Sequence, residues 1–419
     1  MNCLLATLSN DWACPVQIFA HRRFQECLEG NRSRTNKGSI AGRWLFNCYN
    51  TYQYIDRQTI EYNGVAGSAI QSPVVAGVAD DQGQGIVTAR SNAPVFVVGC
   101  HRSGTALLYD SLLSAGGFPL YHHAPYVHTA LIRICGDPAI RKNREKLWKL
   151  WLRSKPFRRT GLAADDIRSQ VLRECRSGGD FLRITMGELA RRAGVLRWAV
   201  HDCDNIFYIP VIKQEIPDAL FVHVVRDGRD AALSMNRQHP EAPRGWLKQR
   251  SLAVWSLLWQ WTVHKGRRFG QEIPSDYIEV RYEDLVQNPE QTLSTLGHFL
   301  DHDLDYSRIR KNAIGRVLAP NTIWKEESSP ETFSPVNRWK TKLSQSEIAV
   351  VENLIGEALR EFHYPLTTEG SKSGNFDPTL RMMRLFYPQY FETKLFLQSK
   401  TVVGRLAKGT RLELDPVTD

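Results

Sequence analysis

Two arginine-containing turns carry the residue types that bind phosphate-like anions. Arg102-Ser103-Gly104-Thr105 follows the apolar run 95–99, and Arg226 follows a second apolar run at 220–225. Arginine offers forked donors to phosphate or sulfate oxygens, and a loop that opens a helix adds backbone amides at the positive end of the helix dipole. Ser234 follows Arg226 by eight residues, which places it on the next helix and lets it face the same anion. The sequence therefore predicts two anion-binding turns.

The first turn partly imitates a nucleotide P-loop, because Gly99 and Gly104 are five residues apart. A P-loop has a lysine after its second glycine, and this chain has Thr105 there. The replacement disfavours hydrolysis of ATP or GTP. A small-molecule kinase or another P-loop phosphotransferase stays open as an alternative at this point.

The elements that must position these turns alternate between strands and helices. Short apolar runs at 95–99 and 220–225, with a third strand at 277–281, are typical of buried parallel strands. Helices are expected after each turn, at 106–115 and 229–235. Two more helices are expected, one opened by Asn288-Pro289-Glu290 with Asn288 as its cap and one opened by the capping box Ser344/Glu347. This order predicts an α/β fold, a three-layer sandwich whose central parallel sheet carries a P-loop-like strand-loop-helix.

Composition and charge limit the class of protein and its ligands. The chain has 419 residues, 42% of them hydrophobic, and a formal net charge of +10. A basic chain favours an anionic ligand, but it shows no cluster of lysine and arginine interleaved with aromatics, so nucleic acid is not expected. We expect a poorly ordered extension over 1–90, the catalytic domain over 91–366 and a tail over 367–419.

The cysteines and the hydropathy indicate the compartment. Eight cysteines are scattered singly, without a CxxC pair or a Cys/His ligand spacing, which predicts reduced thiols and no metal site. No run of about 18 apolar residues suggests a membrane span, and no signal peptide is recognised at the N-terminus. A cytoplasmic location is therefore expected. Segment 380–397 mixes basic and apolar residues, so it suits a membrane surface, a partner or packing on the domain, and Pro388 is expected to break or kink any helix there.

Four segments in the same order resemble the sulfotransferases that use 3′-phosphoadenosine-5′-phosphosulfate (PAPS). The loop from Arg102 to Ala106 resembles the family's strand-loop-helix for the 5′-phosphosulfate, and Arg226 with Ser234 resembles its 3′-phosphate motif. Tyr282-Glu283-Asp284 resembles the segment whose tyrosine lies by the nucleotide, and 335–340 resembles the late basic loop near the 3′-phosphate.

The resemblance covers about residues 94–366 and implies a transferase that moves a sulfuryl group from PAPS, leaving the bisphosphate PAP, without a metal. It implies that the nucleotide contacts are Arg102, Ser103, Gly104, Thr105, Ala106, Arg226, Ser234, Tyr282, Arg338 and Lys340. Arginine at position 102 is similar to the protein-tyrosine and bacterial branches, whereas the cytosolic small-molecule enzymes usually have lysine.

The general base is the least determined part of the resemblance. Relatives place a glutamate about 17–19 residues after the loop threonine or a histidine on a strand before the 3′-phosphate motif. The first region of this chain has His122 and His123 and no glutamate, and the second has His201 followed by Asp202. His201 is the preferred candidate, oriented by Asp202 or Asp204, and His123 or His122 is the alternative. The missing glutamate keeps a catalytically inactive PAP-binding protein as a further alternative.

The acceptor is not identified by any motif. A small molecule, a glycan or a peptide that offers a hydroxyl or amine would suit the family chemistry. Residues 118–195, read as Arg-rich and irregular, are the expected source of acceptor specificity and weakly favour an anionic acceptor. Trp255 and Trp259 are four residues apart on a helical stretch and are expected to pack in the core rather than to form an acceptor platform.

Overall fold

The computed structural model describes residues 90–238, 251–318, 334–367 and 378–400, together with Leu412 and Leu414. All of these described residues belong to one compact unit. The expected extension over 1–90 therefore lies outside the described residues, apart from Arg90.

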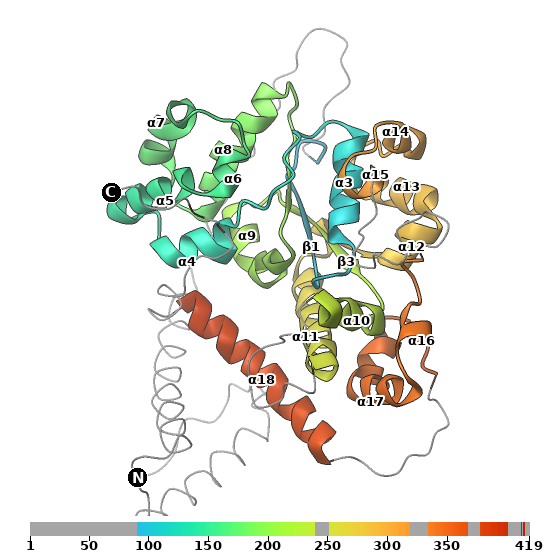
Figure 1. Cartoon of the computed structure of the whole chain (residues 1–419). Coiled ribbons are helices and arrows are strands. Elements are labelled where there is room, and N and C mark those ends of the chain that lie inside the picture. The colour runs from blue at the N-terminus through green and yellow to red at the C-terminus, as the bar shows by residue number, and fades with distance from the viewer. Residues whose placement is uncertain are drawn as a thin grey trace, which may run out of the picture. The chain divides into compact units, whose positions relative to one another are not determined.

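Four parallel strands form the central sheet in the order β2-β1-β3-β4 (Figure 1). They are β1 (Val95–Gly99), β2 (Ala199–His201), β3 (Leu220–Val225) and β4 (Tyr277–Arg281). Val97 is in register with His201 on one side and Val222 on the other. Because all four strands run in the same direction, their carboxyl ends meet at one edge of the sheet, where ligands bind in this class of fold.

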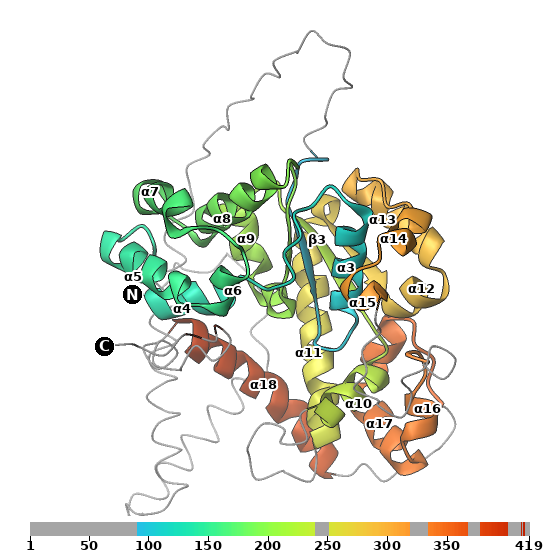
Figure 2. The same cartoon turned by 45° about the horizontal axis from the view of Figure 1, so that its top comes forward.

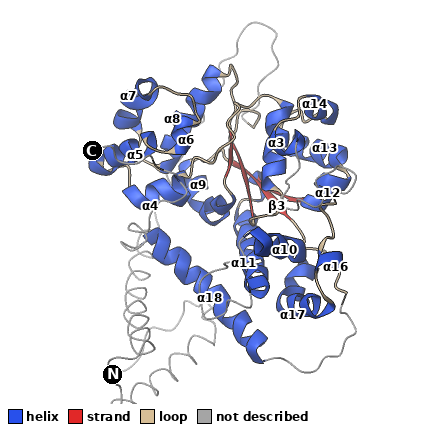
Figure 3. Cartoon of the chain, viewed as in Figure 1, coloured by secondary structure: helices blue, strands red, loops and turns tan. Residues whose placement is uncertain are grey.

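Helices cover both faces of the sheet, which confirms the expected three-layer α/β sandwich (Figure 3). Side chains alternate along a strand, so Phe96 and Phe221 pack into one apolar cluster while Val97 and Val222 pack into the other. The first cluster lies against α4–α9 and the second against α3 and α12–α14. A third cluster joins α10, α11, α17 and α18 at the end of the sheet that carries the turns.

The helical elements have the following bounds: α3 (Thr105–Ala115), η1 (Val127–Leu131), α4 (Ile132–Cys135), α5 (Arg141–Leu152), α6 (Lys155–Arg158), α7 (Ala164–Glu174), α8 (Gly178–Arg192), η2 (Cys203–Tyr208), α9 (Ile209–Glu215), α10 (Gly228–Gln238), α11 (Ser251–Glu272), η4 (Pro274–Asp276), α12 (Tyr282–Gln287), α13 (Pro289–Leu300), α14 (Tyr306–Lys311), α15 (Gly315–Leu318), α16 (Trp339–Lys342), α17 (Gln345–Glu361) and α18 (Pro378–Lys400).

Helix boundaries agree with the sequence where capping and proline signals are strong. The Ser344 hydroxyl accepts from the amide of Glu347, and the Glu347 carboxylate accepts from the Ser344 amide at 2.8 Å, so the capping box forms at the start of α17. Proline opens α13 as expected, but the side chain of Asn288 makes no capping hydrogen bond, so that part of the expectation is wrong. Residues 118–195 are also not irregular, because α4 to α8 occupy most of them.

The last described helix, α18, packs on the domain beside α11, α17 and α4 in both views (Figures 1 and 2). Its residues Met383, Tyr387 and Phe391 are buried in the third apolar cluster. The helix continues through Pro388, so the expected break does not occur. No helix among the described residues is both long enough and apolar enough to cross a membrane.

Candidate functional site

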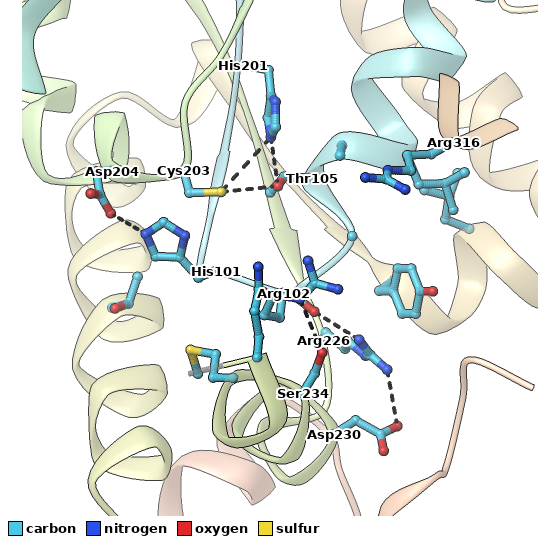
Figure 4. A pocket seen from close by; sticks show the side chains of 18 of the residues that line it. His101, Arg102, Thr105, His201, Cys203, Asp204, Arg226, Asp230, Ser234 and Arg316 are labelled. Carbon is cyan, nitrogen blue, oxygen red and sulfur yellow. Dashed lines mark hydrogen bonds and ion pairs between the residues drawn. The ribbon is translucent and has the colours of Figure 1, made fainter. Parts of the chain in front are cut away.

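A cavity of about 1200 Å³ opens at the carboxyl edge of the sheet, where both arginine turns meet (Figure 4). Arg102 and Arg226, which are far apart in sequence, both line it. The two turns follow β1 and β3, and these strands are hydrogen-bonded neighbours in the sheet. The sheet order therefore places the two predicted anion-binding turns side by side.

The first turn connects β1 to α3 in a conformation that exposes the start of the helix. Gly104, with φ +92°, occupies the N-cap position of α3 and supplies no side-chain cap. The first amides of α3 thus keep their hydrogen-bonding capacity for a ligand. A Cβ atom at Gly104 would lie 2.1 Å from Cδ2 of Tyr282, so the loop needs glycine for close packing as well as for its backbone angle. Arg102 adopts φ 68°, a left-handed conformation that non-glycine residues rarely take.

Arg226 connects its own segment to the other three that the sequence singled out. Its Nη1 donates to the carbonyl of Arg102 at 2.9 Å, and its Nη2 donates to the carbonyl of Pro335 at 2.6 Å. The guanidinium carbon lies 4.7 Å from the ring centre of Tyr282. Nε of Arg102 donates to the Ser234 hydroxyl at 3.2 Å, which joins the two turns a second time.

Positive charge predominates on the cavity wall. Only two acidic side chains line it among the described residues, Asp204 and Asp230, against seven basic ones: Arg102, Arg133, Arg226, Arg310, Arg316, Arg338 and Lys394. Burial, with the nearby charges of Arg226 and Arg316, lowers the pKa of Arg102 to about 10. Like charges this close repel one another, and a bound anion would relieve that repulsion. The cavity wall therefore favours a ligand with several negative charges.

Asp230 is the acidic cavity-lining group beside Arg226. Its carboxylate lies 3.9 Å from Nη2 of Arg226, and it accepts from the amide of Trp339 at 2.9 Å. Burial nevertheless raises the pKa of Asp230 to about 6, because the attraction of Arg226 only partly offsets the loss of water. At neutral pH this carboxylate helps to hold Arg226 and the late loop together.

Most of the predicted nucleotide-binding residues line the cavity: Arg102, Gly104, Thr105, Ala106, Arg226, Ser234, Tyr282 and Arg338. Ser103 is fully buried beside the loop and is not part of the lining. Lys340 is exposed and lies outside the lining, because Trp339 takes the buried position at the start of α16. Trp259 is buried as expected, whereas Trp255, also expected in the core, lines the cavity.

His201 lies at the end of β2 and faces the first turn. Its Nε2 is 3.0 Å from the Thr105 hydroxyl, and its ring stacks on Tyr109 with the ring centres 5.4 Å apart. The expected orientation by a following aspartate is not what the structure has: Asp204 bonds to His101 at 2.9 Å, and Asp202 accepts from Thr129.

The alternative histidines occupy a different place. His122 lies 3.5 Å from a carboxylate oxygen of Asp110, and the ring of His123 packs against Tyr121. Neither is among the residues that line the cavity. Of the three histidines considered from sequence, His201 is the one beside the loop threonine.

Cys203 completes a cluster around Thr105 that the sequence did not reveal. Its Sγ lies 3.2 Å from the Thr105 hydroxyl and 4.0 Å from Nε2 of His201. Burial raises the pKa of the Cys203 thiol, but the charges and hydrogen bonds of His101 and His201 outweigh it and hold the pKa well below its ordinary value. Asp204 raises the pKa of His101, and contact with Cys203 raises that of His201 against the effect of burial.

Two of these features had no usable signal in the sequence. Cys203 stands singly and enters the site through η2, whose path after β2 depends on tertiary packing. Arg316 comes from the short helix α15, held against α3 by its own amide donating to Asp110 at 2.6 Å. Among the described residues, no group of three or more histidine, cysteine, aspartate or glutamate side chains is arranged to hold a metal ion.

Comparison with known proteins gives similarities in sequence and in structure. The chain is 30% identical over 123 residues to a Caenorhabditis briggsae protein with the provisional name protein-tyrosine sulfotransferase, a match that covers 29% of this chain and 40% of that relative. A sulfotransferase domain from the curacin biosynthetic pathway aligns with a TM-score of 0.41 at 16% identity, over 65% of this chain and 98% of that one. Mouse sulfotransferase SULT7A1 complexed with PAP aligns with a TM-score of 0.39 at 14% identity, over 72% and 89%.

The sequence profile of the sulfotransferase family matches residues 94–306. This range includes β1 to β4, both arginine turns and Tyr282. The chain therefore belongs to the sulfotransferase family.

Proposed function

We propose that this protein transfers the sulfuryl group of PAPS to a hydroxyl group of an acceptor. The observation that carries the proposal is the pairing of two guanidinium groups, Arg102 and Arg226, at the ends of neighbouring strands in one cavity. A doubly phosphorylated nucleotide offers negative charge at both ends, which suits two separate cationic turns. Family membership and the PAP-bound mouse relative agree with this donor.

The donor's two ends are assigned to different elements. Arg226, Ser234 and Arg338 are proposed to hold the 3′-phosphate, because all three line the cavity. Arg226 follows β3 and Ser234 lies on α10, while the loop that carries Arg338 is bonded to Arg226 through the Pro335 carbonyl. The amides that open α3, with Arg102 and Thr105, are proposed to hold the 5′-phosphosulfate. The ring of Tyr282 lies between the ends, against both Gly104 and Arg226.

Sulfuryl transfer then requires alignment and charge stabilisation. The acceptor oxygen forms a bond to sulfur while the bond from sulfur to the phosphate oxygen breaks, and the electron pair leaves with the bisphosphate. Arg102 and the α3 amides stabilise the charge that develops on that leaving oxygen. Because these donors are already fixed by Ser234 and by the loop backbone, they need little reorganisation during the reaction.

His201 is proposed to take the proton of the acceptor hydroxyl. Its Nε2 is the group that contacts Thr105, next to the proposed position of the sulfuryl group. The stacked Tyr109 fixes the ring, and the Tyr109 hydroxyl is in turn held by the Tyr121 carbonyl at 2.7 Å. Cys203 raises the pKa of His201, because a thiolate beside the ring favours the protonated imidazole. The protonated imidazole cannot act as a base.

Nucleotide-dependent thermal stability tests the donor, and labelled PAPS tests the reaction. PAP at about 100 times its Kd should stabilise the full chain by ~2.7 kcal/mol and raise the Tm by roughly 3–5 °C, whereas ATP with magnesium should not. Transfer of labelled sulfate to a mixed set of phenols, alcohols, glycans and tyrosine peptides should then occur. Stabilisation by ATP with magnesium and not by PAP would favour the kinase alternative. Stabilisation by PAP without any transfer would favour an inactive binding protein.

A further inference from the structure

The cavity has two parts on opposite sides of the first turn. One part is walled by α3 and by α12–α15, and it includes Tyr282 and Arg316. Figure 4 shows Arg316 on one side of the turn, with His101 and Asp204 on the other. The residues proposed to hold the donor lie in the first part and at the strand ends. The second part, beyond His101 and Asp204, is therefore left for the acceptor.

Four segments surround this second part, which we call the acceptor chamber: η1 with α4, η2, α11 and α18. Element η2 contacts both η1 and α11, α11 contacts α18, and α18 contacts α4, so the wall closes on itself. Element η2 begins at Cys203, beside the Thr105 hydroxyl. The chamber thus has its reactive end at Thr105 and His201 and extends away from the sheet.

One wall of the chamber is a row of aromatic rings. Phe207 stacks on Trp261 with the ring centres 4.5 Å apart, and Trp261 packs on Phe391 at 5.5 Å. All three residues line the cavity. Nε1 of Trp261 donates to the Glu392 carboxylate at 2.9 Å, which holds the indole in place. Such a fixed apolar wall favours a flat or aliphatic body rather than a heavily hydroxylated one.

The α4 wall of the chamber carries a guanidinium that has no hydrogen-bond or ion-pair partner among the described residues. Arg133 of α4 lines the cavity, and its guanidinium makes no hydrogen bond or ion pair with any described residue, although its Nε is buried. Arg102 and Arg226, by contrast, have hydrogen-bond partners within the site. The buried Nε of Arg133 therefore lacks an acceptor that an anionic ligand group would supply.

The spacing of Arg133 from the reactive end follows from the helix. Thr129, which also lines the cavity, donates to Asp202 at 2.7 Å and so lies next to the start of η2. Arg133 is four residues further along the same continuous helical segment. Because four residues make about one helical turn, Arg133 lies about one turn beyond Thr129 along the axis.

From these observations we infer that the acceptor is a small amphiphilic hydroxy acid: a phenol or alcohol with an apolar body and an anionic group that Arg133 binds. The inference rests on the proposed function and names the substrate class of the same site. The hydroxyl lies at Thr105 and His201, the body lies along Trp261 and its two neighbours, and the anion pairs with Arg133.

A matched pair of acceptors tests this inference on the full chain. Transfer from labelled PAPS is measured to 3-(4-hydroxyphenyl)propanoate and to its methyl ester, which has the same phenol and body but a neutral CO2CH3 group in place of the carboxylate. The parent protein should prefer the acid by about tenfold or more in kcat/KM, since a charge-assisted hydrogen bond is worth at least that factor. Arg133→Gln should abolish the preference and Arg133→Lys should restore part of it. Arg141→Gln, which removes an arginine whose side chain is 85% exposed on α5, should keep the parent preference.

The outcomes separate the inference from the proposed function. PAP should raise the Tm of all four proteins equally, because Arg133 is not placed at the donor. If PAP stabilises the parent and sulfate is transferred, but acid and ester react equally or Arg133→Gln retains the preference, the acceptor class is wrong and the proposed function stands. Transfer only to a tyrosine peptide or an oligosaccharide would overturn the acceptor class in the same way. If PAP does not stabilise the parent, both fail together.

Discussion

Replacement of Arg226 by alanine is the most direct test of the donor site. A guanidinium has five N–H donors, and Arg226 uses two of them for the carbonyls of Arg102 and Pro335. The remaining donors are available to a phosphate. Loss of one or two charge-assisted hydrogen bonds, at ~1.5–3 kcal/mol each, should raise the Kd for PAP by about 100-fold.

The comparison with a nucleotide that lacks the 3′-phosphate makes this test specific. If Arg226 binds the 3′-phosphate, Arg226→Ala should change the Kd for adenosine 5′-monophosphate by less than about threefold. Isothermal titration of both nucleotides with parent and variant gives the four values needed. Arg268→Ala serves as the control, because it removes the same charge at an exposed position outside the cavity lining. If Arg226→Ala weakens the binding of both nucleotides equally, or weakens the binding of neither, the assignment of the 3′-phosphate to Arg226 is refuted.

Stability has to be separated from binding in this experiment. Removing Arg226 leaves the buried Asp230 without its nearest cation, which costs up to about 3–5 kcal/mol when one member of a buried pair is lost. The double variant Arg226→Ala/Asp230→Asn removes the uncompensated carboxylate and should recover much of the Tm. Its PAP affinity should remain low, because the phosphate contact is still absent.

Three further changes test separate parts of the site. Gly104→Ala should weaken PAP binding by more than about tenfold and destabilise the fold by ~1–3 kcal/mol, because the new Cβ would lie 2.1 Å from Tyr282; titration and thermal unfolding measure both effects. Asp230→Asn should reduce the pH dependence of stability: the folded pKa of Asp230 is raised from 3.8 to about 6, so the folded parent binds the proton more tightly and loses roughly 3 kcal/mol as pH rises through that range. Cys203→Ser should move the acidic limb of the profile of kcat/KM against pH to lower pH, because the thiolate that raises the pKa of His201 is gone.

Each of these changes has a matched comparison. Gly187→Ala on α8 adds the same methyl group where nothing lies within 4 Å, so it should leave PAP binding unchanged and stabilise the helix by ~0.5–1 kcal/mol. Asp165→Asn at an exposed position should keep the parent's pH dependence of unfolding. An acidic limb that does not move in Cys203→Ser would show that this thiol does not control the base.

The sheet and the donor turns were predictable because their signals are local. The apolar, β-branched runs at 95–99 and 220–225 have few alternatives to buried parallel strands, and a strand that ends at an arginine turn places that arginine at the binding edge. The eight-residue spacing of Ser234 from Arg226 then puts both at one anion. These residues were found without any knowledge of the tertiary structure.

The rest of the site depends on packing between distant segments. Arg316 reaches the cavity only because α15 packs on α3. Trp255 lines the cavity, although its spacing from Trp259 on α11 suits a core position equally well. The predicted orientation of His201 by an aspartate was wrong for a related reason. The turn after β2 places Asp204 within hydrogen-bond distance of His101 instead. Charged residues in 118–195 suggested loops, but their apolar partners, such as Trp151 and Phe181, pack these residues into helices.

The arrangement of α18 has a consequence for how such an enzyme can diversify. The helix supplies Phe391 and Leu395 to the acceptor chamber, while the donor turns come from segments that precede it in the chain by more than 100 residues. Substitutions on one face of this helix can alter the acceptor chamber without disturbing the proposed nucleotide contacts. Acceptor preference can therefore change through α18 while the arginine turns at the sheet edge stay the same.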